Sequence, residues 1–219
     1  MMTEISHNNE FTTLILDFKV EPEKIKQLTK VAQENIEQIM SKKPGFISAN
    51  LHESSDGTRF LNYSQWKNRE AYETALNFLT KEEVSFGEKL LELGDINWNY
   101  YKIISSIGKT PSEISAENGF PTGINIIDVE SKNSKKLIRL LTDYGNNVLK
   151  NKNGFVSANI HKSYDEKRLI NYVQWESFDG LADFFNNCDA GSYFKSWKEI
   201  SQPVWNLFKV VYTHNHNYS

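Results

Sequence analysis

The polar residues that could do chemistry lie in two neighbouring stretches, both with the pattern of β-strands. Side chains alternate across a strand, so Asn50 and His52 share one face of the first, and Asn62, Ser64 and Trp66 share one face of the second. If the strands form a hairpin with their even-numbered residues together, Asn50 comes opposite Asn62. A face that combines amides, an imidazole, hydroxyls and aromatic groups is typical of a small-molecule cavity rather than of a dry core.

The same residues also have structural interpretations, which the sequence leaves open. The amides could satisfy backbone groups, His52 could bond to the nearby turn, and Trp66 could belong to the core. Asp56 and Arg59 flank the turn between the two strands. We assign Asp56 and Arg59 to turn capping and a local ion pair.

The whole motif occurs twice, 109 residues apart. Residues 45–66 and 154–175 align without a gap and are identical at 13 of 22 positions. The second copy of the polar set is Asn159, His161, Asn171 and Trp175, with Val173 in place of Ser64. This repeat predicts two copies of one module of about 100 residues, a size that can bury its own core.

Each copy alternates between strand and helix periodicity. In the first copy, strand patterns cover residues 11–20, 46–53, 59–66 and 97–107, and helical patterns run from Pro22 to residue 39 and over 68–92, with a break near Thr80. In the second copy, strand patterns cover 122–129, the hairpin 154–175 and 204–213, and helical patterns cover 134–150 and 177–200. The order βαββαβ is that of the ferredoxin-like split unit. We therefore predict an α+β fold with module 1 over residues 1–107, a polar linker over 108–120 and module 2 over 121–219.

Composition narrows the range of partners. The longest apolar runs are too short to cross a bilayer, and acidic and basic residues intermingle at a net charge of −3, so we expect neither membrane nor nucleic-acid binding. Cys188 is the single cysteine, which agrees with a reducing compartment. The first ten residues lack the basic and apolar parts of a secretory signal, so we expect a cytoplasmic location.

The hairpin motif carries a family resemblance. The run Gly45-Phe-Ile-Ser-Ala-Asn-Leu-His52, followed by Ser54-x-Asp56-Gly57-x-Arg59-x-x-Asn62-Tyr63-x-Gln65-Trp66, resembles the signature hairpin of the antibiotic biosynthesis monooxygenase (ABM) domain, and it occurs in both copies. The resemblance implies that two ferredoxin-like modules pack their sheets into a dimeric α+β barrel, with a pocket in each module between sheet and helices. A tandem pair would supply both halves covalently, so we expect an intramolecular pseudo-dimer that needs no second chain.

The resemblance also implies a site. Family members that oxidise polycyclic phenols to quinones without a cofactor use an Asn and a Trp on the third strand and a Tyr on the helix that follows. Asn62, Trp66 and Tyr72 match this pattern and would be catalytic, with no metal and no cofactor. In the second copy the Tyr position is Leu181, so that pocket departs from the pattern and is expected to be weaker. The other polar residues would contact the substrate: Asn50, His52, Ser64, Asn159, His161, Asn171 and Trp175.

The implied activity is a cofactor-independent monooxygenase that oxidises a small aromatic phenol or anthrone with O2. Amide donors such as Asn62 suit an oxyanion, the Trp66 indole can donate one hydrogen bond, and Tyr72 can transfer a proton. One alternative is a non-catalytic pseudo-dimer that binds a hydrophobic metabolite. Another is a pseudo-dimer whose pockets are filled by its own side chains.

Overall fold

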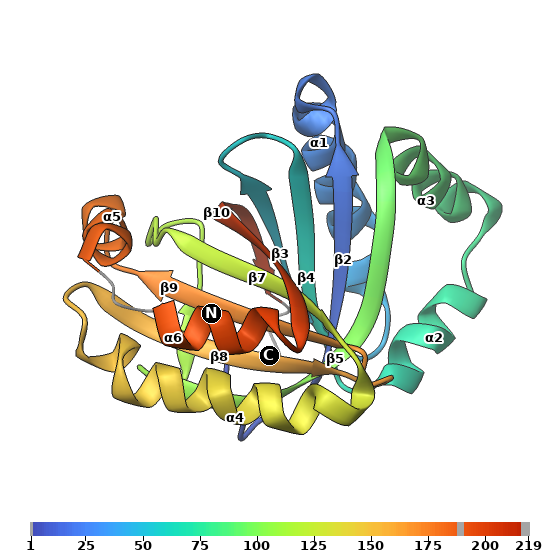
Figure 1. Ribbon diagram of the computed structural model, residues 1–219. Helices are drawn as coiled ribbons and strands as arrows, with labels where there is room; N and C mark the ends of the chain where they lie inside the picture. Colours follow the sequence, from blue (N-terminus) through green and yellow to red (C-terminus); the bar gives the residue numbers. More distant parts are fainter. Residues whose placement is uncertain (1, 188–190, 216–219) are drawn as a thin grey trace.

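The computed structural model describes residues 2–187 and 191–215, so Cys188 lies outside the described residues (Figure 1). Both modules have the predicted order of elements. Module 1 consists of β2 (Thr12–Val20), α1 (Ile25–Gln38), β3 (Phe46–Ser54), β4 (Arg59–Trp66), α2 (Arg69–Asn77), α3 (Lys81–Leu93) and β5 (Gly94–Gly108). Module 2 consists of β7 (Thr122–Val129), α4 (Ser131–Asn147), β8 (Phe155–Ser163), β9 (Arg168–Trp175), α5 (Phe178–Asn187), α6 (Gly191–Lys198) and β10 (Ser201–Asn215).

The strands of the two modules close into one antiparallel barrel, ordered β10-β3-β4-β2-β5-β8-β9-β7. Each module contributes a four-stranded sheet, and its long last strand crosses to the other module. The first half of β5 pairs with β2 and its second half pairs with β8, while β10 pairs with β7 and then with β3. The predicted intramolecular α+β barrel is therefore confirmed.

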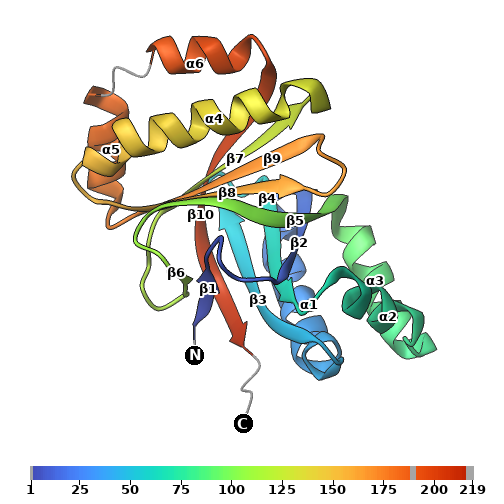
Figure 2. The ribbon, with the colours of Figure 1, turned by 90° about the horizontal axis from the view of Figure 1, so that it is seen from below.

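The helices cover the outside of the barrel. Those of module 1 lie against one side and those of module 2 against another (Figure 2). In α1, the apolar residues Ile25, Leu28 and Ile36 fall at helical spacing and are buried against the sheet. Thr80 and Glu83 form a reciprocal capping box that starts α3, which explains the predicted break between α2 and α3. Within the described residues, no helix is long and apolar enough to cross a membrane.

A β-bulge in β3 decides which way the polar residues face. The pairing of β3 with β4 shifts between Phe46 and Ser48, so Phe46 lies opposite Trp66 but Asn50 lies opposite Tyr63. The predicted pairing of Asn50 with Asn62 is wrong, because the bulge adds one residue to β3 and inverts its alternation relative to β4. The same shift occurs in β8, between residues 155 and 157.

The bulge therefore separates the polar residues into two sets. Asn50, His52 and Tyr63 face the barrel interior, whereas Asn62 and Trp66 face the helices.

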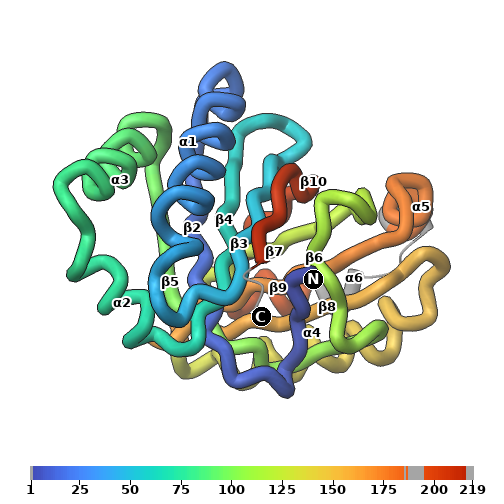
Figure 3. The backbone as a smooth tube through the Cα atoms, turned by 180° about the vertical axis from the view of Figure 1, so that it is seen from behind, coloured from blue at the N-terminus to red at the C-terminus, as the bar shows by residue number. Residues whose placement is uncertain are grey.

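Two short strands that do not belong to the eight-stranded sheet close one end of the barrel. β1 (Thr3–Ile5) pairs with β6 (Ser112–Ile114), which lies in the segment predicted as an irregular linker (Figure 3). The side-chain amides of Gln65 and Gln174 donate to the backbone oxygens of Glu4 and Glu113, both at 2.8 Å. The linker is thus partly a structural element, held by the two copies of the repeated glutamine.

Candidate ligand cavity of module 2

Inside the barrel, histidine side chains of each module form hydrogen bonds with tyrosine hydroxyls of the other module. His52 Nε2 lies 2.9 Å from the Tyr172 hydroxyl, and the Tyr63 hydroxyl lies 3.0 Å from His161 Nε2. Burial lowers the pKa of both histidines from 6.5 to about 4, so both rings are neutral near pH 7. Burial also raises the pKa of both tyrosines, which stay protonated.

The predicted substrate contacts of the first strand in each hairpin lie in this interior. Asn50 Nδ2 donates to Thr3 Oγ1 at 2.9 Å, and Asn159 Nδ2 donates to Ser112 Oγ at 2.8 Å, so both amides hold the strands that close the barrel. Asn50, Asn159 and both histidines are fully buried. The structure does not bring these four residues to the face that carries Asn62 and Asn171.

The residues at the hairpin turn have local roles. Asp56 accepts hydrogen bonds from the Ser54 hydroxyl at 2.6 Å and from the Thr58 backbone N–H at 3.1 Å, so its predicted turn capping is confirmed. Arg59 forms its ion pair with Asp17 on β2 rather than with Asp56. The predicted local pair is wrong, because Arg59 lies beside β2 in the sheet.

In module 1, aromatic side chains pack against one another between sheet and helices. Trp66 packs edge-on against Tyr72, with ring centroids 5.1 Å apart, and Tyr72 packs against Tyr100 at 6.0 Å. The Trp66 indole N–H donates to Ser64 Oγ at 3.2 Å, and burial raises the pKa of Tyr72. The structure brings Trp66 and Tyr72 together as predicted, in direct ring contact with each other.

Module 2 has a cavity at the equivalent place. Its volume is about 400 Å³, within the range of roughly 300–1,000 Å³ that is typical of ligand sites. It lies between the sheet and helices α4, α5 and α6. The described residues that line it are Gly123, Asn125, Ile127, Tyr144, Leu149, Asn171, Val173, Trp175, Leu181, Phe184, Trp197, Lys198, Pro203 and Trp205.

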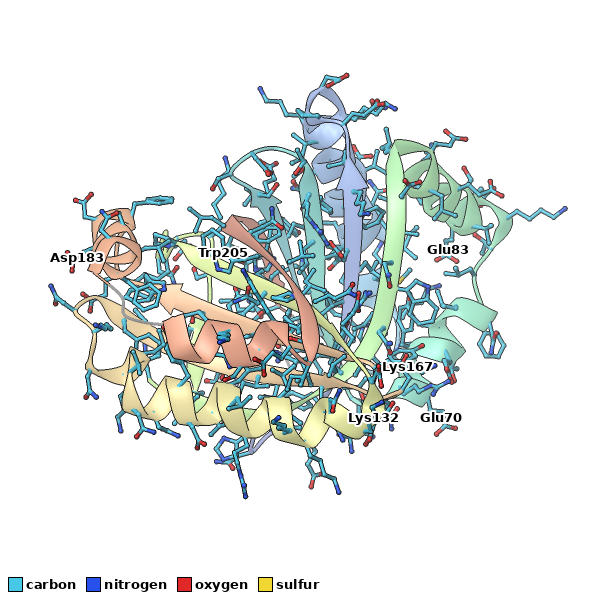
Figure 4. All side chains as sticks on the ribbon, in the orientation of Figure 1. Glu70, Glu83, Lys132, Lys167, Asp183 and Trp205 are labelled. Carbon is cyan, nitrogen blue, oxygen red and sulfur yellow. The ribbon has the colours of Figure 1, made fainter. Side chains whose placement is uncertain are left out.

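Substitutions between the two copies account for this difference. Gly123 of β7 occupies the position of Leu14 in β2, because Gly123 pairs with Val173 as Leu14 pairs with Ser64. A Cβ atom at Gly123 would lie 3.1 Å from Nε1 of Trp205, which projects from β10 (Figure 4). Leu181 likewise stands where module 1 has Tyr72. At these two positions module 2 therefore has the smaller side chain.

One buried polar atom beside the cavity, the Asn171 side-chain oxygen, lacks a protein partner. Asn171 is only 6% exposed, yet its Oδ1 accepts no hydrogen bond from the described residues. Asn62 Oδ1 in module 1 is unpartnered in the same way. Val173 replaces Ser64, so Trp175 lacks the hydroxyl that accepts from the Trp66 indole. Buried polar atoms without partners are costly, and a ligand can satisfy them.

Sequence reasoning missed several residues of this cavity. Tyr144, Lys198 and Trp205 lie on elements far from the hairpin motif. Gly123 could have been found, because an apolar residue of the first copy is replaced by glycine within a strand.

Comparison with known proteins relates this fold to one family. Residues 12–77 match the family model described as antibiotic biosynthesis monooxygenase. This segment of module 1 is thus similar to an ABM domain. Module 2 is similar to module 1, because it repeats the hairpin sequence and has the same order of elements.

Single relatives agree with this assignment. The chain is 38% identical to the tetracenomycin-F1 monooxygenase of Streptomyces glaucescens over 66 residues, which span 30% of this chain and 59% of that relative. A solved structure described as an anthrone oxidase-like protein superposes with a TM-score of 0.84 at 18% identity, covering 98% of this chain and 97% of the other. A structure from Fusobacterium nucleatum gives a TM-score of 0.65 at 11% identity, with 94% of each chain covered. At these identities, the two structures show the tandem ABM fold alone.

Proposed function

We propose that the protein oxidises a small polycyclic phenol or anthrone with O2, and that the reaction takes place in the module 2 cavity. The main support is that Asn171 and Trp175, the Asn and Trp of the ABM pattern, lie beside a largely apolar cavity of about 400 Å³. The relationship of module 1 to tetracenomycin-F1 monooxygenase supports the reaction class. Flat apolar walls with a few convergent polar groups suit an aromatic ligand that bears an oxygen substituent.

The proposed chemistry uses the substrate as its own source of electrons. Loss of a proton gives an electron-rich anion, whose oxygen would accept hydrogen bonds from the Asn171 amide and the Trp175 indole. The anion passes an electron to O2, and a carbon–oxygen bond forms when the two radicals combine. For an anthrone, loss of water then leaves the quinone, so one oxygen atom of O2 enters the product and the other leaves as water. The protein binds, desolvates and stabilises the anion.

A phenol also lines the cavity, although not at the expected position. Leu181 replaces the Tyr of the pattern, but Tyr144 reaches the cavity from α4, where module 1 has Asn35. We assign proton transfer to Tyr144. Its replacement by phenylalanine is expected to lower kcat more than it raises KM.

The repeat supplies matched variants that test the site. Asn171→Ala and Trp175→Phe change the proposed site, and Asn62→Ala and Trp66→Phe make the same changes in module 1. Oxygen uptake and quinone absorbance are measured with anthrone and with hydroquinones, and thermal unfolding verifies that each variant folds. We expect the module 2 variants to lose roughly 100-fold in kcat/KM, as on removal of an oxyanion donor, and the module 1 variants to keep most activity.

If the module 1 variants lose activity and the module 2 variants keep it, the active site is instead formed by Asn62, Trp66 and Tyr72. A non-catalytic binding role is the second candidate, favoured by Leu181 at the tyrosine position. That role predicts quenching of tryptophan fluorescence by an aromatic ligand without any oxygen uptake.

A further inference from the structure

Lys198 distinguishes the cavity of module 2 from a purely apolar one. Among the described residues that line the cavity, it alone carries a charge at neutral pH. Lys198 is the last residue of α6, it is exposed, and it also lines an open polar groove of about 760 Å³ on the adjoining surface. It therefore stands at the rim, where the apolar cavity meets solvent.

Two of the three carboxylates around this rim already pair with a cation other than Lys198. Arg168 pairs with Asp128 at 2.6 Å, and Glu130 pairs with Lys132 at 2.6 Å, so both of these groove carboxylates already have a cation. The other charged residues of the groove are Lys167 and Glu199. Lys198 forms no ion pair within the described part of the chain.

Module 1 has no cation at the corresponding position. Helix α3 and strand β5 of module 1 align with helix α6 and strand β10 of module 2 at an offset of 107 residues. This alignment places Leu91 of α3 at the position of Lys198. Leu91 is 59% exposed. The lysine is thus found in the module that has the cavity.

We propose that the ligand of module 2 is an aromatic acid, with its rings in the cavity and a carboxylate at the rim that pairs with Lys198. This inference rests on the proposed site and narrows its substrate class. A lysine ammonium is a compact point charge on a flexible stem, so it can follow a carboxylate at the edge of a bound ring system. A nearby apolar surface lowers the local dielectric and strengthens such a pair relative to one in open solvent.

Two ligands of nearly equal shape test the proposal. Anthraquinone-2-carboxylate and its neutral amide, anthraquinone-2-carboxamide, are titrated against the full chain, and Kd is obtained from tryptophan fluorescence quenching. We expect the acid to bind roughly fivefold more tightly than the amide, as for an exposed ion pair, and this preference to weaken as salt is raised. Lys198→Gln should remove the preference and leave the amide affinity unchanged. Lys195→Gln, an exposed lysine of the same helix, should change neither Kd.

Each outcome has one interpretation. If the amide binds as tightly as the acid, or if Lys198→Gln keeps the preference, the acidic substrate class is wrong while the cavity remains a binding site. If neither compound binds the wild-type chain, the cavity is not the site, and the proposed function fails with it.

Discussion

The buried histidine–tyrosine pairs make the stability of the barrel depend on pH. His52 and His161 have a folded-state pKa of about 4, against an ordinary value of 6.5 that we take for the unfolded chain. Between these values the unfolded chain binds more protons than the folded one. The contribution of the two neutral histidines to the stability of the fold is therefore fully present above pH 6.5 and is lost as the pH falls toward 4.

The two pKa values set the size of the effect. The shift from a pKa of 6.5 in the unfolded chain to about 4 in the folded chain lowers the free energy of unfolding between pH 7 and pH 5. The loss is about 2 kcal/mol for each histidine and about 4 kcal/mol for the two. Such a loss is a large part of the roughly 5–15 kcal/mol that stabilises a typical domain. The window ends above the ordinary pKa of carboxylates, so acidic side chains contribute little to it.

Urea unfolding at pH 7 and pH 5, followed by tryptophan fluorescence, measures this loss. A double variant with His52→Gln and His161→Gln cannot titrate at these positions and should lose much less than the wild type. Tyr63→Phe with Tyr172→Phe serves as a second test, because it removes both hydroxyls and keeps the histidines. This variant should be less stable at pH 7, by about 1–3 kcal/mol per pair, and should keep the pH dependence. Equal losses in the wild type and the histidine variant would refute the reasoning.

Two further predictions concern the cavity and the barrel end. Gly123→Leu, which gives β7 the residue that Leu14 supplies in β2, should fill the cavity, and fluorescence quenching by anthraquinone-2-carboxamide should disappear while the chain stays folded. Gln65→Ala removes the 2.8 Å hydrogen bond to the Glu4 backbone, so amide hydrogen exchange in residues 3–5 should accelerate. Unchanged exchange there would show that the side chain does not hold β1.

Much of the fold was predictable because the repeat is strong and its strands are regular. The offset of 109 residues and the alternation of strand and helix patterns predicted the repeated module, the order of elements and the break near Thr80. The segment between the modules was harder to assign. β6 is only three residues long, and its pairing with β1 depends on a contact across more than 100 positions, which no local pattern reveals.

The site was less predictable, because one residue of register decides which side chains meet. Alternation alone put Asn50 and Asn62 on one face, but the bulge after Phe46 moves Asn50 into the barrel interior. Nothing in the residue types of this stretch requires a bulge. The sequence shows the substitutions at Gly123 and Leu181, but the open cavity of module 2 depends on the summed volumes of residues that lie far apart in the chain.

The two faces of the repeated hairpin are under different physical constraints, and this explains how the modules can differ. Inside the barrel, His52 bonds to Tyr172 and His161 bonds to Tyr63, so a change in one copy leaves a buried polar group of the other copy unsatisfied, at a cost of about 1–3 kcal/mol. On the outer face, by contrast, each hairpin packs mainly against the helices of its own module. A residue such as Leu181 can therefore change there without disturbing the other copy. Joining two modules in one chain thus lets the outer face of one module change while the interior of the barrel that both modules share stays the same.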